Sequence, residues 1–243
     1  MLLATGVTAI ELQSPVTQVR VVELYTSEGC SSCPPAEGWL RQLDAQPALW
    51  RGFVPLALHV GYWDRLGWPD PFAHEVFEQR QRTHARLGNA AAVYTPGMLL
   101  DGRAWEGWRE RPAPPVAARP AGRLRLRYSA PEVDLRWTPE QMPAGALTAH
   151  AVLLGHDIER RIQRGENQGR VLRHGFVVLA HASAGLTRSG ERLGARLSLP
   201  EAAADVPPRA IAAWVEDTAS HRPRQAVGGW LHAISAAVGA DTP

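Results

Sequence analysis

The order of hydrophobic and polar positions predicts alternating strands and helices in the first part of the chain. The β-branched run at 19–25 (VRVVELY) predicts a buried strand, and 53–60 (FVPLALHV) predicts a second one. Between them, apolar residues at helical spacing follow two prolines, which the first turn of a helix tolerates. A second helix is predicted at 73–88, which ends in a glycine.

The pattern changes after a third strand and a proline-rich segment. The strand around 98–100 leads into Asp101 and Gly102, a strong hairpin signal, and 109–122 is typical of a linker or an extended crossing. Residues 123–129 (RLRLRYS) then alternate strictly, as in a half-buried strand. Further short segments follow with turn residues between them, namely EVDLRW, LTAHAVLL, RVLRHGFVVLAHA, GARLSL and AIAAWVED. This spacing predicts an antiparallel β-sandwich.

These patterns divide the chain into three parts. We expect strands and helices in a first domain at 19–108, a proline-rich linker at 109–122, and an antiparallel β domain at 123–235. A chain of 243 residues is long enough for one large domain or two small ones.

The N-terminal residues allow two interpretations. Residues 2–10 are mostly small and apolar, as in the middle of a signal peptide, but no charged start precedes them. They are either a mis-started signal peptide, which we favour, or an ordinary strand. No apolar run reaches the roughly 18 residues that span a bilayer, so no transmembrane segment is expected. We therefore expect a periplasmic or secreted protein, and otherwise a cytoplasmic one.

Composition narrows the possible chemistry. The formal net charge is +2, and all 26 basic residues are arginine. The lack of lysine excludes Schiff-base and P-loop chemistry. The arginines are scattered among acids and form no basic stripe, so no nucleic-acid partner is expected. The motifs of serine hydrolases, zinc proteases and dinucleotide enzymes are absent from the sequence as well, and no cofactor is expected.

The only two cysteines, Cys30 and Cys33, lie three residues apart where the first strand leads into the first helix. This spacing brings their β-carbons to roughly 5–6 Å, so that a small adjustment closes a disulfide. The ring is so short that closing it stabilises the fold little through loop entropy. Such a disulfide is better suited to reversible opening than to structural support. At a helix N-terminus, Cys30 should be the more exposed and more acidic sulfur, which attacks, and Cys33 the resolving thiol.

Neighbouring residues set the expected reactivity of this pair. Ser31 and Ser32 bring no positive charge, and Glu28 is a like charge that opposes ionisation of a thiol. We therefore expect the pKa of the Cys30 thiol at roughly 6–8.

Two other roles stay open for the cysteines. A dithiolate together with a histidine such as His59 would form a copper site, whereas two cysteines are too few for a Cys₄ zinc site. Alternatively, the disulfide is inert and belongs to a scaffold whose β domain binds a partner protein. The copper site requires a histidine nitrogen within about 4–5 Å of both sulfurs. The scaffold requires buried sulfurs and a large exposed apolar patch. We assign no metal ligands from the sequence.

The order of strand, Cys-x-x-Cys helix, strand, helix and Thr-Pro before a hairpin resembles the thioredoxin fold. A more specific resemblance, to the bacterial family called domain of unknown function 1223, extends from about Val19 to about Asp217. It rests on the segments VVELYTSEGCSSCPPAE, HVGYWDRLGWPDPFA, RQRTHARLG, VYTPGMLLDGR and RGENQGRVLRH. Members of this family are mostly secreted or exported proteins without an established biochemical role. The resemblance implies an α/β thioredoxin-like fold followed by an all-β, sandwich-like C-terminal domain.

Three features depart from the pattern of that family. Gly61 and Glu37 each stand where the family usually has Asp, and the proline-rich 109–122 stands where it usually has a helix. The first departure puts in doubt any role for a carboxylate in that loop. The last suggests a shortened thioredoxin-like layer.

The thioredoxin resemblance implies roles for further residues. The peptide bond between Thr95 and Pro96 is expected to be cis and to lie beside the cysteines. Glu23 occupies a strand position comparable to that of the buried thioredoxin carboxylate, where burial would raise its pKa towards the working range of a general base. Strand alternation could instead direct Glu23 into a salt bridge.

Aromatic residues after the second strand complete the expected site. Tyr62, Trp63 and Trp68 offer apolar surface where a substrate would dock, or they simply cap the sheet. The sequence thus predicts a thiol–disulfide oxidoreductase or a redox-responsive protein of the cell envelope. Its substrate would be a protein or a small thiol.

Overall fold

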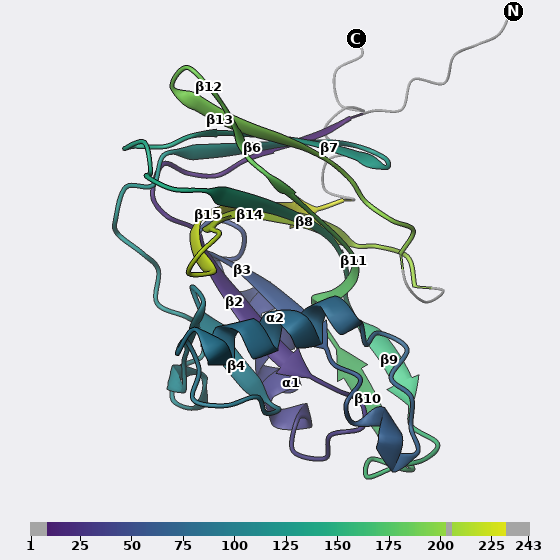
Figure 1. The fold of residues 1–243 in the computed structure, drawn as a ribbon. Coiled ribbons are helices and arrows are strands. Elements are labelled where there is room, and N and C mark those ends of the chain that lie inside the picture. Colours follow the sequence, from purple (N-terminus) through teal and green to yellow (C-terminus); the bar gives the residue numbers. More distant parts are fainter. Residues whose placement is uncertain (1–8, 203–205, 232–243) are drawn as a thin grey trace, which may run out of the picture.

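The chain folds mainly into β-sheet (Figure 1). In the computed structural model, which describes residues 9–202 and 206–231, the strands form an eight-stranded sheet, a five-stranded sheet and a two-stranded ribbon. The eight-stranded sheet has the order β15 (Arg222–Trp230), β14 (Ala210–Asp217), β8 (Leu147–Gly155), β11 (Val177–Gly185), β3 (Phe53–His59), β2 (Arg20–Thr26), β4 (Gly97–Leu100) and β5 (Arg103–Ala104). The five-stranded sheet has the order β1 (Ile10–Gln13), β6 (Arg123–Ser129), β7 (Glu132–Thr138), β13 (Arg192–Ser198) and β12 (Thr187–Ser189). The ribbon pairs β9 (Ile158–Arg161) with β10 (Val171–His174).

Helices are few in the described part of the chain. The α-helices are α1 (Pro34–Arg41) and α2 (Glu75–Arg86), and the short 3₁₀ helices are η1 (Gln42–Ala45), η2 (Asp64–Leu66) and η3 (Gly107–Arg109). Both α-helices lie at the end of the molecule away from the five-stranded sheet (Figure 1). None of the helices among the described residues has the length and apolar character needed to cross a membrane.

The large sheet contains strands from both halves of the chain. β3 pairs in parallel with β2 on one side and with β11 on the other, whereas the other neighbours in this sheet are antiparallel. The predicted fold class, an α/β thioredoxin-like fold followed by an all-β sandwich-like domain, is therefore wrong. The described chain is mostly β-sheet, with a large mixed sheet and two α-helices. Periodicity identifies a strand but not its neighbours, so it could not show that β11 pairs with β3.

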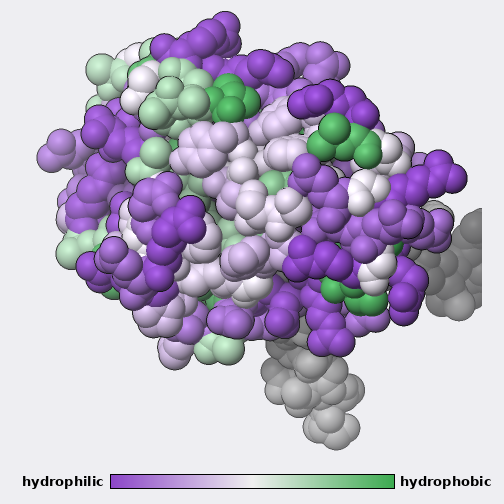
Figure 2. Space-filling model, turned by 90° about the horizontal axis from the view of Figure 1, so that it is seen from below, coloured by the Kyte–Doolittle hydropathy of each residue, from purple (hydrophilic) through white to green (hydrophobic). Residues whose placement is uncertain are grey.

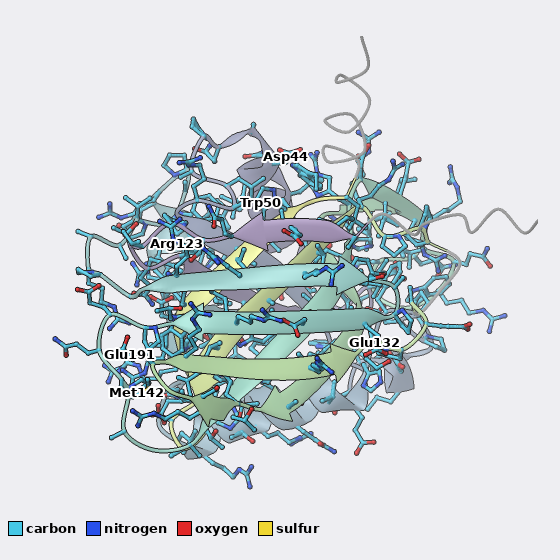
Figure 3. All side chains as sticks on the ribbon, turned by 90° about the horizontal axis from the view of Figure 1, so that it is seen from above. Asp44, Trp50, Arg123, Glu132, Met142 and Glu191 are labelled. Atoms are coloured by element: carbon cyan, nitrogen blue, oxygen red, sulfur yellow. A yellow bond between two sulfur atoms is a disulfide. The ribbon has the colours of Figure 1, made fainter. Side chains whose placement is uncertain are left out.

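The five-stranded sheet covers one part of the large sheet, and its strands cross those beneath at an angle (Figure 3). Ile211, Ala213 and Val215 of β14 belong to the apolar core between the two sheets. The alternate residues Ala212 and Trp214 belong to a second core on the other face of the same strand. Because both faces of β14 are buried, its sequence is a nearly continuous apolar run.

The two α-helices contact opposite faces of β2. Thr26 Oγ1 donates to Glu37 Oε1 of α1 at 2.5 Å, whereas Glu23 Oε2 accepts from Arg80 Nε of α2 at 2.7 Å. Successive side chains of a strand point to opposite faces of the sheet. Even-numbered residues of β2 therefore face α1, which directly follows the cysteines, and odd-numbered residues face α2.

Several predicted elements are confirmed, and one is divided. The segment RLRLRYS forms β6, and Asp101 and Gly102 both have positive φ in the turn between β4 and β5. The segment RVLRHGFVVLAHA, predicted as a single segment, forms β10 and β11 with a break at Gly175. A Cβ at Gly175 would lie 3.0 Å from Cα of Arg41, so only glycine lets the chain pass α1 this closely.

The N-terminal part of the chain is described from residue 9. Ile10–Gln13 form β1, which pairs with β6 in an antiparallel manner. Residues 2–8, most of the segment interpreted as a signal peptide, lie outside the described residues. The predicted division into 19–108, 109–122 and 123–235 as independently folding parts stays a prediction.

Candidate functional site

Cys30 and Cys33 form a disulfide where the chain leaves β2 and enters α1. Their Cα atoms are 5.5 Å apart. Cys33 is the N-cap residue of the helix, and two prolines follow in its first turn. Both cysteines are fully buried, with an exposed fraction of 0%. The expectation of an exposed Cys30 is therefore wrong, because another part of the chain covers the pair.

A distant loop holds the backbone around Cys30. We call residues 162–170, which join β9 to β10, the cover loop. The buried Asn167 donates from Nδ2 to the carbonyl oxygens of Glu28 and Cys30, at 2.8 and 3.0 Å. This side chain satisfies two carbonyl groups of the segment that leads into the disulfide.

Two further contacts anchor the cover loop. The hydroxyl of Ser31 donates to Oε2 of Glu166 at 2.7 Å, and the backbone N–H of Ser31 donates to the same oxygen at 3.3 Å. Gly165 has a φ of +76°, and a Cβ there would lie 3.2 Å from Cβ of Trp68. The cover loop therefore connects the cysteine segment with the aromatic loop after β3.

Trp63 lies beside the cysteine segment and contacts Thr95. The indole N–H of Trp63 donates to Thr95 Oγ1 at 2.8 Å. A Cβ at Gly29 would lie only 3.0 Å from Cβ of Trp63, which places this tryptophan against the residue before Cys30. The bond between Thr95 and Pro96 is cis, as expected from the sequence. Trp63 thus links the Thr-Pro pair to the cysteine segment.

The other two predicted aromatic residues have different surroundings. The indole N–H of Trp68 donates to Glu28 Oε2 at 2.7 Å, so Trp68 belongs to the cysteine site. The hydroxyl of Tyr62 donates to Gln81 Oε1 of α2 at 3.3 Å. All three aromatic side chains are only half-buried. Their roles as substrate contacts stay predictions.

His174, at the end of β10, lies between two buried carboxylates. Its Nδ1 is 2.6 Å from Glu37 Oε2, and its Nε2 is 3.1 Å from Glu28 Oε1. Burial alone would lower the pKa of His174, but Glu37 and Glu28 raise it to about 10. Burial likewise would raise the pKa of Glu37, yet His174 holds it below its ordinary value. His174 is therefore an imidazolium that neutralises charge next to the disulfide segment.

His59, the last residue of β3, lies next to this bridge. Its ring centroid is 5.3 Å from that of His174. Its Nδ1 is 2.7 Å from Asp70 Oδ2, and the same oxygen accepts the backbone N–H of Glu28 at 2.7 Å. The Nε2 atom of His59 is buried and has no hydrogen-bond partner.

Glu23 lies on the α2 side of β2 and not on the cysteine side. Its carboxylate accepts hydrogen bonds from Arg80 at 2.7 and 3.1 Å and from the hydroxyl of Tyr25 at 3.0 Å. Burial alone would raise the pKa of Glu23, but Arg80 and His84 outweigh it and lower that pKa. The expected rise of the Glu23 pKa towards the range of a general base is absent. Glu23 instead makes a salt bridge, which was the alternative that strand alternation allowed.

The proposed copper arrangement is not found among the described residues. The two sulfurs are bonded to each other. A group of potential metal ligands within 4.8 Å of one another does occur in the described chain, but it consists of Glu37, His59 and His174 and includes neither sulfur.

Several members of the site had no assigned role in the sequence analysis. Asn167 and His174 lie in the segment RGENQGRVLRH, which supported only the family resemblance. Asp70 lies in a loop of tryptophan, proline and glycine that shows no periodicity. Polar residues at the end of strands were the only available signal, and they do not reveal contacts between segments so far apart in the chain.

Comparison with known proteins identifies the family to which the chain is similar. A family model described as "Protein of unknown function (DUF1223)" matches residues 21–216, which confirms the resemblance found in the sequence. No curated protein matches the chain.

Two solved structures are similar to this chain. A crystal structure of a protein from Agrobacterium tumefaciens has 22% sequence identity and a TM-score of 0.60, covering 88% of this chain and 94% of that one. HBP35 of Porphyromonas gingivalis has 12% identity and a TM-score of 0.61, covering 90% of this chain and 77% of that one. At these identities the similarity shows the fold alone.

Proposed function

The chain belongs to this family of unknown function, and we propose that its Cys30–Cys33 pair is a reversible disulfide that exchanges with a protein or a small thiol. The observation that carries this proposal is the disulfide itself, closed between the N-cap residue of α1 and the residue three positions before it. Its ring is too short to stabilise the fold appreciably through loop entropy. The positive end of the helix dipole lies at the N-cap residue Cys33 and favours a thiolate there.

The proposed exchange has two steps. The thiolate of Cys30 attacks one sulfur of a partner disulfide, which forms a mixed disulfide and releases the second partner sulfur as a thiolate. The thiolate of Cys33 then attacks the Cys30 sulfur, which restores the Cys30–Cys33 disulfide and releases the first partner sulfur. Two electrons pass to the partner, and its two thiolates take up the protons that the cysteines lost. In the reverse direction, an external thiol reduces the pair.

Access to the sulfurs requires movement of the cover loop. Both cysteines are fully buried, and Asn167 holds the carbonyl group of Cys30. A reductant therefore reacts with the disulfide only after local opening of the chain. In this redox-responsive protein, the closed state keeps the disulfide away from solvent. Thr95, Pro96 and Trp63 would then border the opened sulfurs, and Tyr62 and Trp68 would offer aromatic surface to the partner.

The cell envelope is the compartment that suits this chemistry. Stable disulfides form mainly in oxidising environments such as the periplasm and the extracellular space. The Cys30–Cys33 bond supports an assignment to the periplasm or to secretion.

Thiol reactivity tests the proposal directly. In reduced protein with Cys33→Ser, the rate of Cys30 alkylation is measured against pH. We expect a titration midpoint well below about 8.5, the value of a free thiol, because the helix N-terminus stabilises the thiolate. The matched Cys30→Ser protein controls for reaction at Cys33. A midpoint at or above the free-thiol value, or no reaction at any pH, would falsify the proposal.

An inert scaffold disulfide is the second candidate, and the complete burial of both sulfurs favours it. That role also requires a large exposed apolar patch. Large exposed hydrophobic side chains in the described chain are few and scattered, and in the face seen in Figure 2 hydrophobic residues form small separate groups. Equilibration in glutathione buffers separates the two candidates. An exchanging pair should have a potential of about −180 to −270 mV, and an inert disulfide should lie below about −300 mV.

A further inference from the structure

Three buried side chains from three separate elements converge near the cysteine segment. Glu37 belongs to α1, His59 ends β3 and His174 ends β10. Each offers one potential ligand atom, and these three atoms lie within 4.8 Å of one another. From this geometry we infer that the protein has a binding site for a divalent transition-metal cation such as Zn²⁺, held by these three side chains. The site is separate from the sulfur chemistry proposed above.

His59 has a ring nitrogen that no protein group uses. Its Nδ1 is 2.7 Å from Asp70 Oδ2, so Nδ1 donates to this carboxylate and Nε2 is the nitrogen left for another partner. This Nε2 is buried without a hydrogen-bond partner, and the His59 side chain has an exposed fraction of 0%. A buried polar atom in this state is rare and costly. A cation bound to the lone pair would satisfy it.

Both histidines have the outer contact that metal-binding histidines commonly make. In such sites the nitrogen that does not bind the metal donates to a carboxylate, which fixes the tautomer and the ring orientation. Asp70 occupies this position for His59, and Glu28 occupies it for His174, 3.1 Å from Nε2. Asp70 is itself held by the backbone N–H groups of Glu28 and Phe72, at 2.7 and 2.9 Å.

The local charges also suit a dication. The carboxylates of Glu28, Glu37 and Asp70 are buried close to the three ligand atoms, and the guanidinium of Arg160 lies 3.3 Å from Glu28. A divalent cation bound here would bring positive charge among these buried carboxylates. Two imidazoles and one carboxylate are a ligand set that Zn²⁺ uses in proteins.

The test uses the full chain with its disulfide intact, so that no thiolate can bind metal. Protein stripped with a chelator is titrated with ZnCl₂ in a calorimeter. We expect one Zn²⁺ per chain, and at least tenfold weaker binding by His59→Gln. His156→Gln is the matched control. His156 also has one ring nitrogen near a carboxylate, 3.2 Å from Asp44, and one buried nitrogen without a partner, but it is outside the ligand group.

The outcomes separate this site from the redox proposal. Stoichiometric binding by the oxidised wild type and by His156→Gln, with weak binding by His59→Gln, supports the site. No binding by the oxidised wild type, or equal binding by His59→Gln, overturns it. If His59→Gln does not unfold cooperatively, Glu37→Gln replaces it and the same criterion applies. None of these results depends on the alkylation of Cys30, which is measured on reduced protein.

Discussion

Glu23 and Arg80 form the centre of a buried polar cluster between β2, α2 and β14. Arg80 contacts Glu23 at 2.7 Å and Glu216 at 2.8 Å, and Glu216 also accepts from the indole of Trp214 at 2.9 Å. The sequence showed an acid inside a buried strand but not its partner, which lies 57 positions further along on another element. Burial raises the pKa of such an acid. The charged partner Arg80 reverses the direction of this shift for Glu23.

Replacement of Glu23 by Gln should reduce stability without changing thiol reactivity. The variant leaves Arg80 buried with Glu216 as its remaining carboxylate, and we expect the free energy of unfolding in urea to fall by about 3 kcal/mol. Glu159→Gln is the control, because its pair with Arg173 is exposed and should contribute under about 0.5 kcal/mol. The pH profile of Cys30 alkylation should be the same in both. A shifted profile with unchanged stability would make Glu23 a general base after all.

The same variant should show a characteristic pH dependence. The pKa of Glu23 is lower in the folded protein than its ordinary value of 4.5, so the unfolded chain binds more protons in acid. The stabilisation by Glu23 is therefore fully present above that value and is lost as the pH falls towards the folded-state pKa. Urea titrations should thus show a smaller difference between the wild type and Glu23→Gln at acidic pH than at pH 7.

The cover loop is the element that we expect to control access to the disulfide. Its two hydrogen bonds from Asn167 are buried and are made to carbonyl groups on either side of Gly29. No local pattern could assign this contact, since the loop lies between two short strands and its partners precede α1. The strands β2 and β3 and the helix α2 were predictable because burial and helical periodicity are local properties.

Loss of the Asn167 contacts should open the site. Two buried hydrogen bonds of about 1 kcal/mol each hold the closed state, so Asn167→Ala should speed reduction of the disulfide by dithiothreitol roughly thirtyfold. Gln168→Ala is the matched control, because the neighbouring Gln168 side chain is exposed. Equal reduction rates in the two variants would mean that the cover loop does not limit access.

Residues on the two sides of the predicted proline-rich linker, 109–122, contact one another throughout the molecule. Residues beyond 122 supply β11, which pairs with β3, and they also supply Glu216 to Arg80. His174 and Asn167 reach back to the cysteine segment in the same way. Composition and periodicity placed a boundary at the proline-rich segment because the pattern changes there. Pairing between distant strands and buried ion pairs leave no such local signature.

A fragment of residues 9–122 should therefore not fold alone. It would expose the edge of β3 that β11 covers, and it would leave Arg80 and Glu37 without the partners Glu216 and His174. We expect a poorly dispersed NMR spectrum and no cooperative urea transition for the fragment. The full chain should unfold in one transition, with fluorescence and circular dichroism giving the same midpoint. A cooperative, well-dispersed fragment would instead show that the first 122 residues are an independent domain, and that the mixed sheet forms by docking of two folded parts.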